Sequence, residues 1–162
     1  MKKAALIMGS DSDLPIVEKA AAVFKRLGIG YTVHVMSAHR TPDRVTEFAR
    51  RAESEDYGCL VCFAGKAAHL AGVVAANTVL PVIGVPIKGS DLGGMDALLS
   101  TVQMPSGVPV ACVAIDGGAN AAWLAARILG VDDYILREAL REEAQLMARQ
   151  VVEKEEKILR GV

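Results

Sequence analysis

The sequence predicts an α/β fold in which a parallel sheet is covered by helices on both faces. Short runs rich in Val, Ile and Leu alternate along the chain with longer segments whose apolar residues recur at helical spacing. The short runs are continuously apolar, which is typical of parallel strands buried on both faces. The length of 162 residues, without a visible linker or repeat, predicts one domain over residues 1–162.

The first strand is expected at residues 4–8 and ends at Gly9. Asp13 then provides a helix cap, Pro15 fits the first turn, and Gly28 ends the helix. The same patterns place the later elements. They predict strands at residues 31–36, 60–64, 81–85 and 108–115, and helices at residues 41–54, 68–77, 97–102 and 119–129.

The last segment, residues 132–160, has an apolar stripe in dense charge, which predicts one long helix. At 1.5 Å per residue this helix extends roughly 40 Å, about the diameter of the whole domain. A helix of that length overhangs its own subunit or turns back. We therefore expect residues 132–160 to take part in oligomer contacts. The stripe consists of Leu136, Leu140, Ala144, Met147 and Val151.

Composition narrows the class of protein. The chain is 52% hydrophobic and 23% charged with a formal net charge of −1, so it lacks the basic surface of nucleic-acid binders. No apolar run reaches the ~18 residues that a membrane span requires. The odd number of cysteines does not fit a disulfide framework, and Cys59 and Cys62 are expected to be buried thiols on opposite faces of a strand. We expect a cytoplasmic protein that binds neither nucleic acid nor membrane.

Three loops are expected to meet at one edge of the sheet, because ligands of such folds bind at the carboxyl ends of the strands. They are residues 9–13, 37–40 and 65–69. The first combines a glycine, two hydroxyls and a helix start, which together suit an anion cradle; plain helix capping is the alternative. It matches neither the dinucleotide fingerprint nor the P-loop. Its two aspartates have no third acidic partner at a neighbouring strand end, so no metal site is predicted.

The other two loops carry histidines. His39 stands beside Arg40 at a strand end, and a proton-transfer group next to an anion anchor suits a phosphorylated substrate; a solvated loop is the alternative. In the third loop, His69 either lines a pocket or packs, and Lys66 either binds an anion or points to solvent. Residues 87–95 have the length and glycine content of a binding lid or of an interface.

One enzyme family matches the chain in several segments, in order and over nearly its whole length. The segments are residues 8–13 (MGSDSD), 37–42 (SAHRTP), 67–70 (AAHL), 80–86 (LPVIGVP), 102–105 (VQMP), 107–110 (GVPV) and 120–122 (NAA). They resemble the N5-carboxyaminoimidazole ribonucleotide mutases of purine (IMP) biosynthesis, the PurE family. The resemblance implies a three-layer flavodoxin-like fold, a homo-octamer, and no metal or organic cofactor. It also implies the transfer of a carboxylate from the exocyclic nitrogen of an aminoimidazole ribotide to ring carbon 4.

The resemblance assigns roles position by position. His39 is the expected catalytic residue, which protonates the carbamate nitrogen and later removes the ring proton. The enclosed site holds carbon dioxide beside the ring between the two steps. Gly65, Lys66 and His69 form the wall around the base and the carboxylate. The expected ribotide-binding residues are Ser10, Ser12, Asp13, Ser37 and Arg40, with Arg40 and the serines at the phosphate and Asp13 at the ribose hydroxyls.

Two positions depart from the mutase pattern, which usually reads Gly-Gly-Ala-Ala-His-Leu-Pro-Gly. Here Lys66 replaces the second glycine and Ala71 the proline. A basic residue is more typical of the related carboxylases that use free carbon dioxide, so that activity is the alternative function. A flavodoxin-like binding module without catalysis is a third hypothesis. Because the carbamate is unstable, transient hand-over from the upstream ATP-dependent carboxylating synthetase is a further hypothesis.

Overall fold

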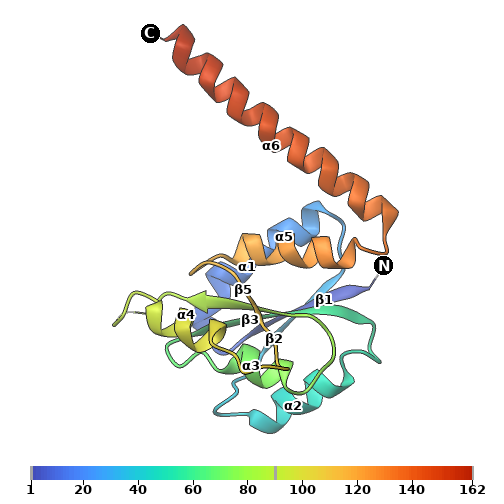
Figure 1. Cartoon of the computed structure of the whole chain (residues 1–162), viewed down its shortest axis with the longest axis vertical. Coiled ribbons are helices and arrows are strands. Elements are labelled where there is room, and N and C mark those ends of the chain that lie inside the picture. The colour runs from blue at the N-terminus through green and yellow to red at the C-terminus, as the bar shows by residue number, and fades with distance from the viewer. Residues whose placement is uncertain (1, 90, 162) are drawn as a thin grey trace.

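The computed structural model describes residues 2–89 and 91–161, which contain a five-stranded sheet (Figure 1). Its strands in chain order are β1 (Lys3–Met8), β2 (Tyr31–Val35), β3 (Tyr57–Gly65), β4 (Val82–Ile87) and β5 (Ala111–Cys112). They lie side by side in the order β2-β1-β3-β4-β5, and every neighbouring pair is parallel. This is the flavodoxin-like order, so the predicted fold class is confirmed.

Helices cover both faces of the sheet and complete three layers (Figure 1). After a 3₁₀ turn η1 (Asp11–Asp13), they are α1 (Leu14–Arg26), α2 (Pro42–Arg51), α3 (Leu70–Ala75), α4 (Met95–Val102), α5 (Gly118–Leu129) and α6 (Tyr134–Arg160). Helices α1 and α5 pack together on one face, and α2, α3 and α4 lie on the other.

Each face of the sheet has its own apolar core, because successive strand residues point to opposite sides. Cys59 belongs to the core under α1 and α5, and Cys62 to the core under α2 and α3. Both are buried free thiols, as their spacing predicts. Small side chains let α5 lie close to the sheet. Its fully buried alanines are Ala121, Ala122, Ala125 and Ala126.

The fifth strand is shorter than predicted. A strand is expected over residues 108–115, but only Ala111 and Cys112 form β5 and pair with β4. β5 is an edge strand with a single neighbour, and Pro109 has no N–H to donate to a ladder. Val113 still donates its N–H to the carbonyl oxygen of Gly84 at 3.1 Å, so the chain continues beside β4 without strand geometry.

Helix α6 projects away from the three layers (Figure 1). Asp133 caps its start by accepting the backbone N–H of Leu136 at 2.9 Å, and Leu136 is the buried residue of this helix. An ion pair between Arg26 and Glu143 ties α6 to α1. Beyond that pair, large apolar side chains are exposed, namely Met147, Val151, Val152, Ile158 and Leu159. In the part of the chain that the structure describes, no helix is both long and apolar enough to span a membrane.

Candidate active site

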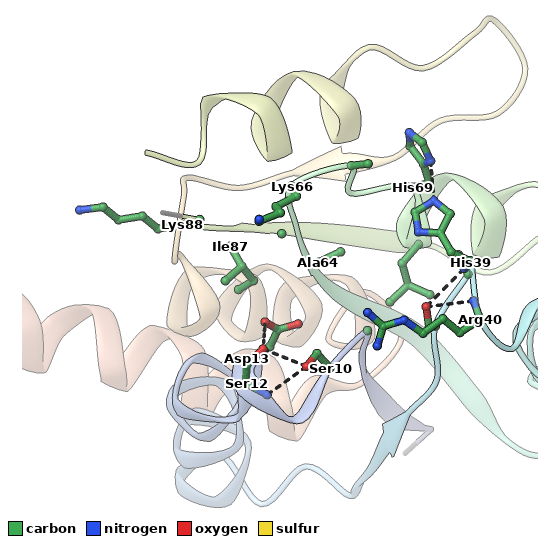
Figure 2. A pocket seen from close by; sticks show the side chains of 17 residues that line it. Ser10, Ser12, Asp13, His39, Arg40, Ala64, Lys66, His69, Ile87 and Lys88 are labelled. Carbon is green, nitrogen blue, oxygen red and sulfur yellow. Dashed lines mark hydrogen bonds between the residues drawn. The ribbon is translucent and has the colours of Figure 1, made fainter. Parts of the chain in front are cut away.

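The carboxyl ends of β1, β2, β3 and β4 surround a cavity of about 480 Å³ (Figure 2). The cavity opens where the connections from β1 and β3 diverge, as expected for a sheet of this order. All of the site residues predicted from the sequence line it. They are Ser10, Ser12, Asp13, Ser37, His39, Arg40, Gly65, Lys66 and His69. Their catalytic and binding roles remain predictions.

Hydroxyl groups of the β1–α1 connection form one wall. Ser10 caps η1, because its Oγ accepts the backbone N–H of Ser12 at 3.3 Å. Ser12 Oγ donates to Ser10 Oγ at 2.9 Å and lies 3.3 Å from Asp13 Oδ1 (Figure 2). The capping that the sequence left as an alternative is therefore present at Ser10, whereas Asp13, at the start of α1, makes no side-chain capping hydrogen bond. The same hydroxyls are exposed to the cavity and can turn toward an anion.

Asp13 is the buried carboxyl of this wall, with 7% of its surface exposed. Burial is the main cause that raises the pKa of Asp13 above its usual value, and the nearby carboxylates of Asp11 and Asp116 add to the rise. Hydrogen bonds from Ser12 and Ser10 oppose it. A desolvated carboxyl beside a cavity is a strong acceptor for ligand hydroxyls.

Ser37 organises the connection between β2 and α2. Its Oγ accepts the backbone N–H groups of His39 and Arg40, both at 3.3 Å. Its own N–H donates to Thr41 Oγ1 at 2.9 Å, and that hydroxyl donates back to the Ser37 carbonyl oxygen at 3.0 Å. These bonds fix a turn directly before α2, so the side chains of His39 and Arg40 leave from a defined backbone.

The imidazoles of His39 and His69 are in contact at the rim of the cavity (Figure 2). Nε2 of His39 lies 2.8 Å from Nδ1 of His69, and the ring planes meet at 74°. At that distance one nitrogen must carry hydrogen and the other must accept it. This hydrogen bond thus joins two loops that are 30 residues apart in sequence.

The connection after β3 forms the opposite wall. A Cβ at Gly65 would lie 3.4 Å from the carbonyl oxygen of Ile87, an ordinary contact distance, so the ends of β3 and β4 lie close together here. Lys66 follows with φ of 52°, in the left-handed region that favours glycine. Its ammonium lies 3.1 Å from a carboxylate oxygen of Asp91. Lys66 therefore stands at the cavity wall with a carboxylate partner.

The structure adds Ile87, Lys88 and Gly89 to the cavity lining. The sequence indicated this loop only as a lid or an interface. The backbone N–H of Lys88 donates to Asp116 Oδ1 at 2.9 Å, which holds the start of the loop. The rule that ligands lie at the carboxyl ends of strands could have identified these residues, because β4 is the neighbour of β3.

The lining groups combine two chemical capacities. A guanidinium and several hydroxyls suit a phosphate group, and a pair of imidazoles suits proton transfer. Among residues 2–89 and 91–161, no group of three or more His, Cys, Asp or Glu side chains is placed to hold a metal ion. The arrangement can therefore bind an anionic ligand and move a proton on it.

Comparisons with known proteins give consistent matches. A family model described as AIR carboxylase matches residues 3–150. A Pyrococcus horikoshii protein named N5-carboxyaminoimidazole ribonucleotide mutase is 52% identical over 94% of this chain and 86% of its own length. A Saccharomyces cerevisiae protein named phosphoribosylaminoimidazole carboxylase is 56% identical over 79% of this chain, which is 22% of that longer protein.

A solved structure also matches the fold of this chain over nearly its whole length. The crystal structure of Treponema denticola PurE has a TM-score of 0.87 and 30% sequence identity, and the match covers 95% of this chain and 96% of that one. The structural match thus includes nearly the whole of both chains. Sequence identity near one half over almost the full chain leaves no doubt about descent, and the chain belongs to the AIR carboxylase family, also called the PurE family.

Proposed function

We propose that the protein is an N5-carboxyaminoimidazole ribonucleotide mutase. This isomerase of purine (IMP) biosynthesis converts its substrate into 4-carboxy-5-aminoimidazole ribonucleotide. The observation that carries the proposal is the contact of His39 with His69 in a cavity that also contains Arg40 and serine hydroxyls. The named mutase relative supports it, since 52% identity extends over most of both chains.

The positions of the lining groups favour one orientation of the ribotide. The phosphate binds Arg40 and the hydroxyls of Ser10, Ser12 and Ser37, where charge-assisted hydrogen bonds are available. Asp13 accepts from the ribose hydroxyls, because a carboxylate beside a phosphate is repulsive. The aminoimidazole ring and its carboxylate then lie against the wall formed by Gly65, Lys66 and His69. This orientation brings the ring to the histidine pair.

His39 carries the proton through the reaction. The imidazolium of His39 donates a proton to the carbamate nitrogen. The bond between this nitrogen and the carboxyl carbon then breaks, which gives carbon dioxide and a neutral exocyclic amine. Carbon dioxide stays beside the ring, so its capture by ring carbon 4 is effectively unimolecular. The hydrogen on carbon 4 then transfers to neutral His39, which restores the starting proton count. The steps need no metal or organic cofactor, and His69 orients the ring of His39 through the 2.8 Å contact.

A carboxylase that adds free carbon dioxide to aminoimidazole ribonucleotide is the second candidate. Lys66 favours it, because an ammonium at the cavity wall can attract a carboxylate precursor. The yeast relative named as a carboxylase also shares 56% identity over 79% of this chain. This chain, however, spans 22% of that relative, whereas it spans 86% of the mutase relative.

A direct comparison of two substrates tests the proposal. The protein is supplied with freshly made carbamate ribotide, or with aminoimidazole ribotide and bicarbonate, and formation of the 4-carboxy product is followed. A mutase turns over the carbamate efficiently and the second mixture poorly. The reverse preference identifies the carboxylase, and ribotide binding without turnover of either mixture identifies a binding module.

We also propose that the enzyme works in the cytoplasm as a homo-octamer and receives the unstable carbamate transiently from the upstream ATP-dependent synthetase. The exposed apolar side chains of α6 favour assembly with further copies. Free buried thiols at Cys59 and Cys62 suit a reducing compartment. A carbamate that decomposes in water favours a short transfer path.

A further inference from the structure

The ion pair of Lys66 and Asp91 stands beside the cavity, and the reaction described above does not use it. Lys66 lines the cavity from the end of β3, and Asp91 lies in the connection between β4 and α4. Nζ and Oδ2 are 3.1 Å apart, and each side chain is 67% exposed. Because the pair is open to solvent, an anionic ligand in the cavity can reach the same ammonium.

The stem of Lys66 lies along a neighbouring loop, so its charged end is the part that can change partners. Cγ of Lys66 is 3.6 Å from the position that a Cβ would take at Gly89, so the stem of Lys66 runs along the start of the loop that carries Asp91. The ammonium has three hydrogens to donate. It can therefore donate to the carboxylate of Asp91 and also to an anion in the cavity.

We propose that Asp91 competes with the transferable carboxylate of the ribotide for Lys66, so that this pair sets the preference between carboxylated and non-carboxylated ribotides. The inference rests on the proposed function, which places the substrate carboxylate at the Gly65 turn. A carboxylate that arrives there meets an ammonium that is already paired, and it must displace Asp91 or share Lys66 with it. Aminoimidazole ribotide lacks that carboxylate, so Asp91 does not affect its binding.

The other cationic side chains of the cavity are not placed to bind the transferable carboxylate. Arg40 lies on the loop of His39 and is assigned to the phosphate. Lys88 lines the cavity, but its side chain extends away from the other labelled residues (Figure 2). Lys66 is thus the cation that stands at the carboxylate wall together with a competing anion.

The test is Asp91→Asn, which keeps the size of the side chain and removes its charge. We expect the KM for 4-carboxy-5-aminoimidazole ribonucleotide, measured in the reverse direction, to fall about two- to fivefold, the scale of an exposed ion pair. The inhibition constant of aminoimidazole ribotide, measured in the same assay, should not change. Raising the salt from about 0.05 M to about 0.5 M should reduce the gain, because exposed charges are then screened.

Three further variants control the comparison. Lys66→Met should raise the KM of the carboxylated ribotide, and Asp91→Asn should have no further effect in that background. Glu47→Gln removes a similarly exposed charge, which pairs with Arg51 at 3.5 Å on α2 and lies outside the cavity lining. It should leave both constants unchanged.

An equal change for both ribotides in Asp91→Asn, or the same gain without Lys66, overturns the competition. If the wild-type protein binds neither ribotide, the proposed function itself fails. If it turns over the carbamate but Asp91→Asn leaves the KM of the carboxylated ribotide unchanged, only the competition fails.

Discussion

His39 and His69 form the part of the site on which the proposed chemistry depends most. Their shared hydrogen bond fixes the direction in which the ring of His39 faces and holds that ring at the cavity rim. One imidazole can then serve as acid in the first half of the reaction and as base in the second. Asparagine can keep a hydrogen bond at this position but cannot exchange a proton at neutral pH.

We therefore expect His39→Asn to lower kcat by about 10²–10⁴-fold or more, the usual contribution of a general acid–base group. Ribotide binding and the fold should change little, because the phosphate and ribose contacts come from other side chains. Turnover, calorimetric titration and circular dichroism together check this. Activity within tenfold of the wild-type value would remove His39 from the proton transfers.

The buried carboxyl of Asp13 lowers the stability of the fold but provides an acceptor for the ligand. Burial raises its pKa above the ordinary value of 3.8, so the folded chain holds this proton more tightly than the unfolded chain does. The free energy of unfolding therefore falls as the pH rises from about the unfolded value through the raised folded value. At neutral pH the ionised side chain is a cost to the fold.

Asp13→Asn should remove that cost. We expect the free energy of unfolding at pH 7 to rise by on the order of 1 kcal/mol, and the gain to disappear near pH 3, where both states of the wild-type chain are protonated. Ribotide affinity should fall about tenfold, because an amide lacks the charge-assisted acceptor. Urea titrations at both pH values and ribotide binding check the two effects. An Asn variant no more stable than wild type at pH 7 contradicts the argument.

The site residues could be placed on one rim from the sequence, but their contacts could not. Positions after consecutive parallel strands share an edge by topology alone, and for this reason Ser10, His39 and Lys66 were expected together. The 2.8 Å contact of the imidazoles depends on the register of β2 and β3 on β1 and on the turn that Ser37 holds. Nothing in the spacing of His39 and His69 encodes that register.

At the scale of elements, β5 and the ends of α3 depart most from the sequence prediction. Helix α3 is expected over residues 68–77 but spans Leu70–Ala75. The side chain of Asn77 donates to the carbonyl oxygen of Val73 at 2.9 Å and replaces the next backbone bond. Such local competition between side chain and backbone is weakly marked in a sequence. The buried strands β1, β3 and β4 are better predicted, because apolar runs leave few alternatives.

The junction of β3 and α3 is strained at Lys66. A non-glycine residue at φ of 52° costs about 1 kcal/mol, so the usual glycine of the mutase pattern has a conformational reason. The exposed ion pair with Asp91 offsets little of this cost.

We expect Lys66→Gly to leave mutase kcat within about fivefold, since a charge that binds ground and transition states equally affects KM rather than kcat. The free energy of unfolding should rise by about 0.5 kcal/mol, because relief of strain exceeds the added chain entropy. Kinetics with both ribotides and a denaturant titration check these values. Loss of an efficient carbon-dioxide-dependent reaction in this variant, with no use of the carbamate by wild type, would overturn the mutase assignment.

At the scale of the whole molecule, α6 is the element that the three layers do not explain. It spans 27 residues, and Leu136 is the buried residue near its start. Exposed apolar side chains such as Val151 and Ile158 lie on a helix that its own subunit does not cover. The long helix itself was predictable from its stripe, whereas its direction depends on the turn at Asp133 and the contact of Arg26 with Glu143.

Truncation after Asp132 should therefore impair assembly of the proposed octamer, as measured by sedimentation. Val151→Asp with Ile158→Asp in the full-length chain should act in the same direction without removing the helix. Lys154→Gln, a change at an exposed charged position of the same helix, is the matched control. An intact octamer in both the truncated and the doubly substituted protein would confine α6 to a role within one subunit.

The pairing of α1 with α5 on one face of the sheet also affects the order in which the two faces are covered during synthesis on the ribosome. Residues that cover the other face, in α2, α3 and α4, follow closely on the strands they protect, whereas α5 begins only at Gly118. Until α5 has left the ribosome, it cannot cover the apolar face of β3 and β4 on which it packs in the folded protein. Because the residues most recently joined are still inside the ribosome, α5 becomes available only while α6 is being made. The packing of α5 onto the sheet therefore takes place while α6 still connects the domain to the ribosome.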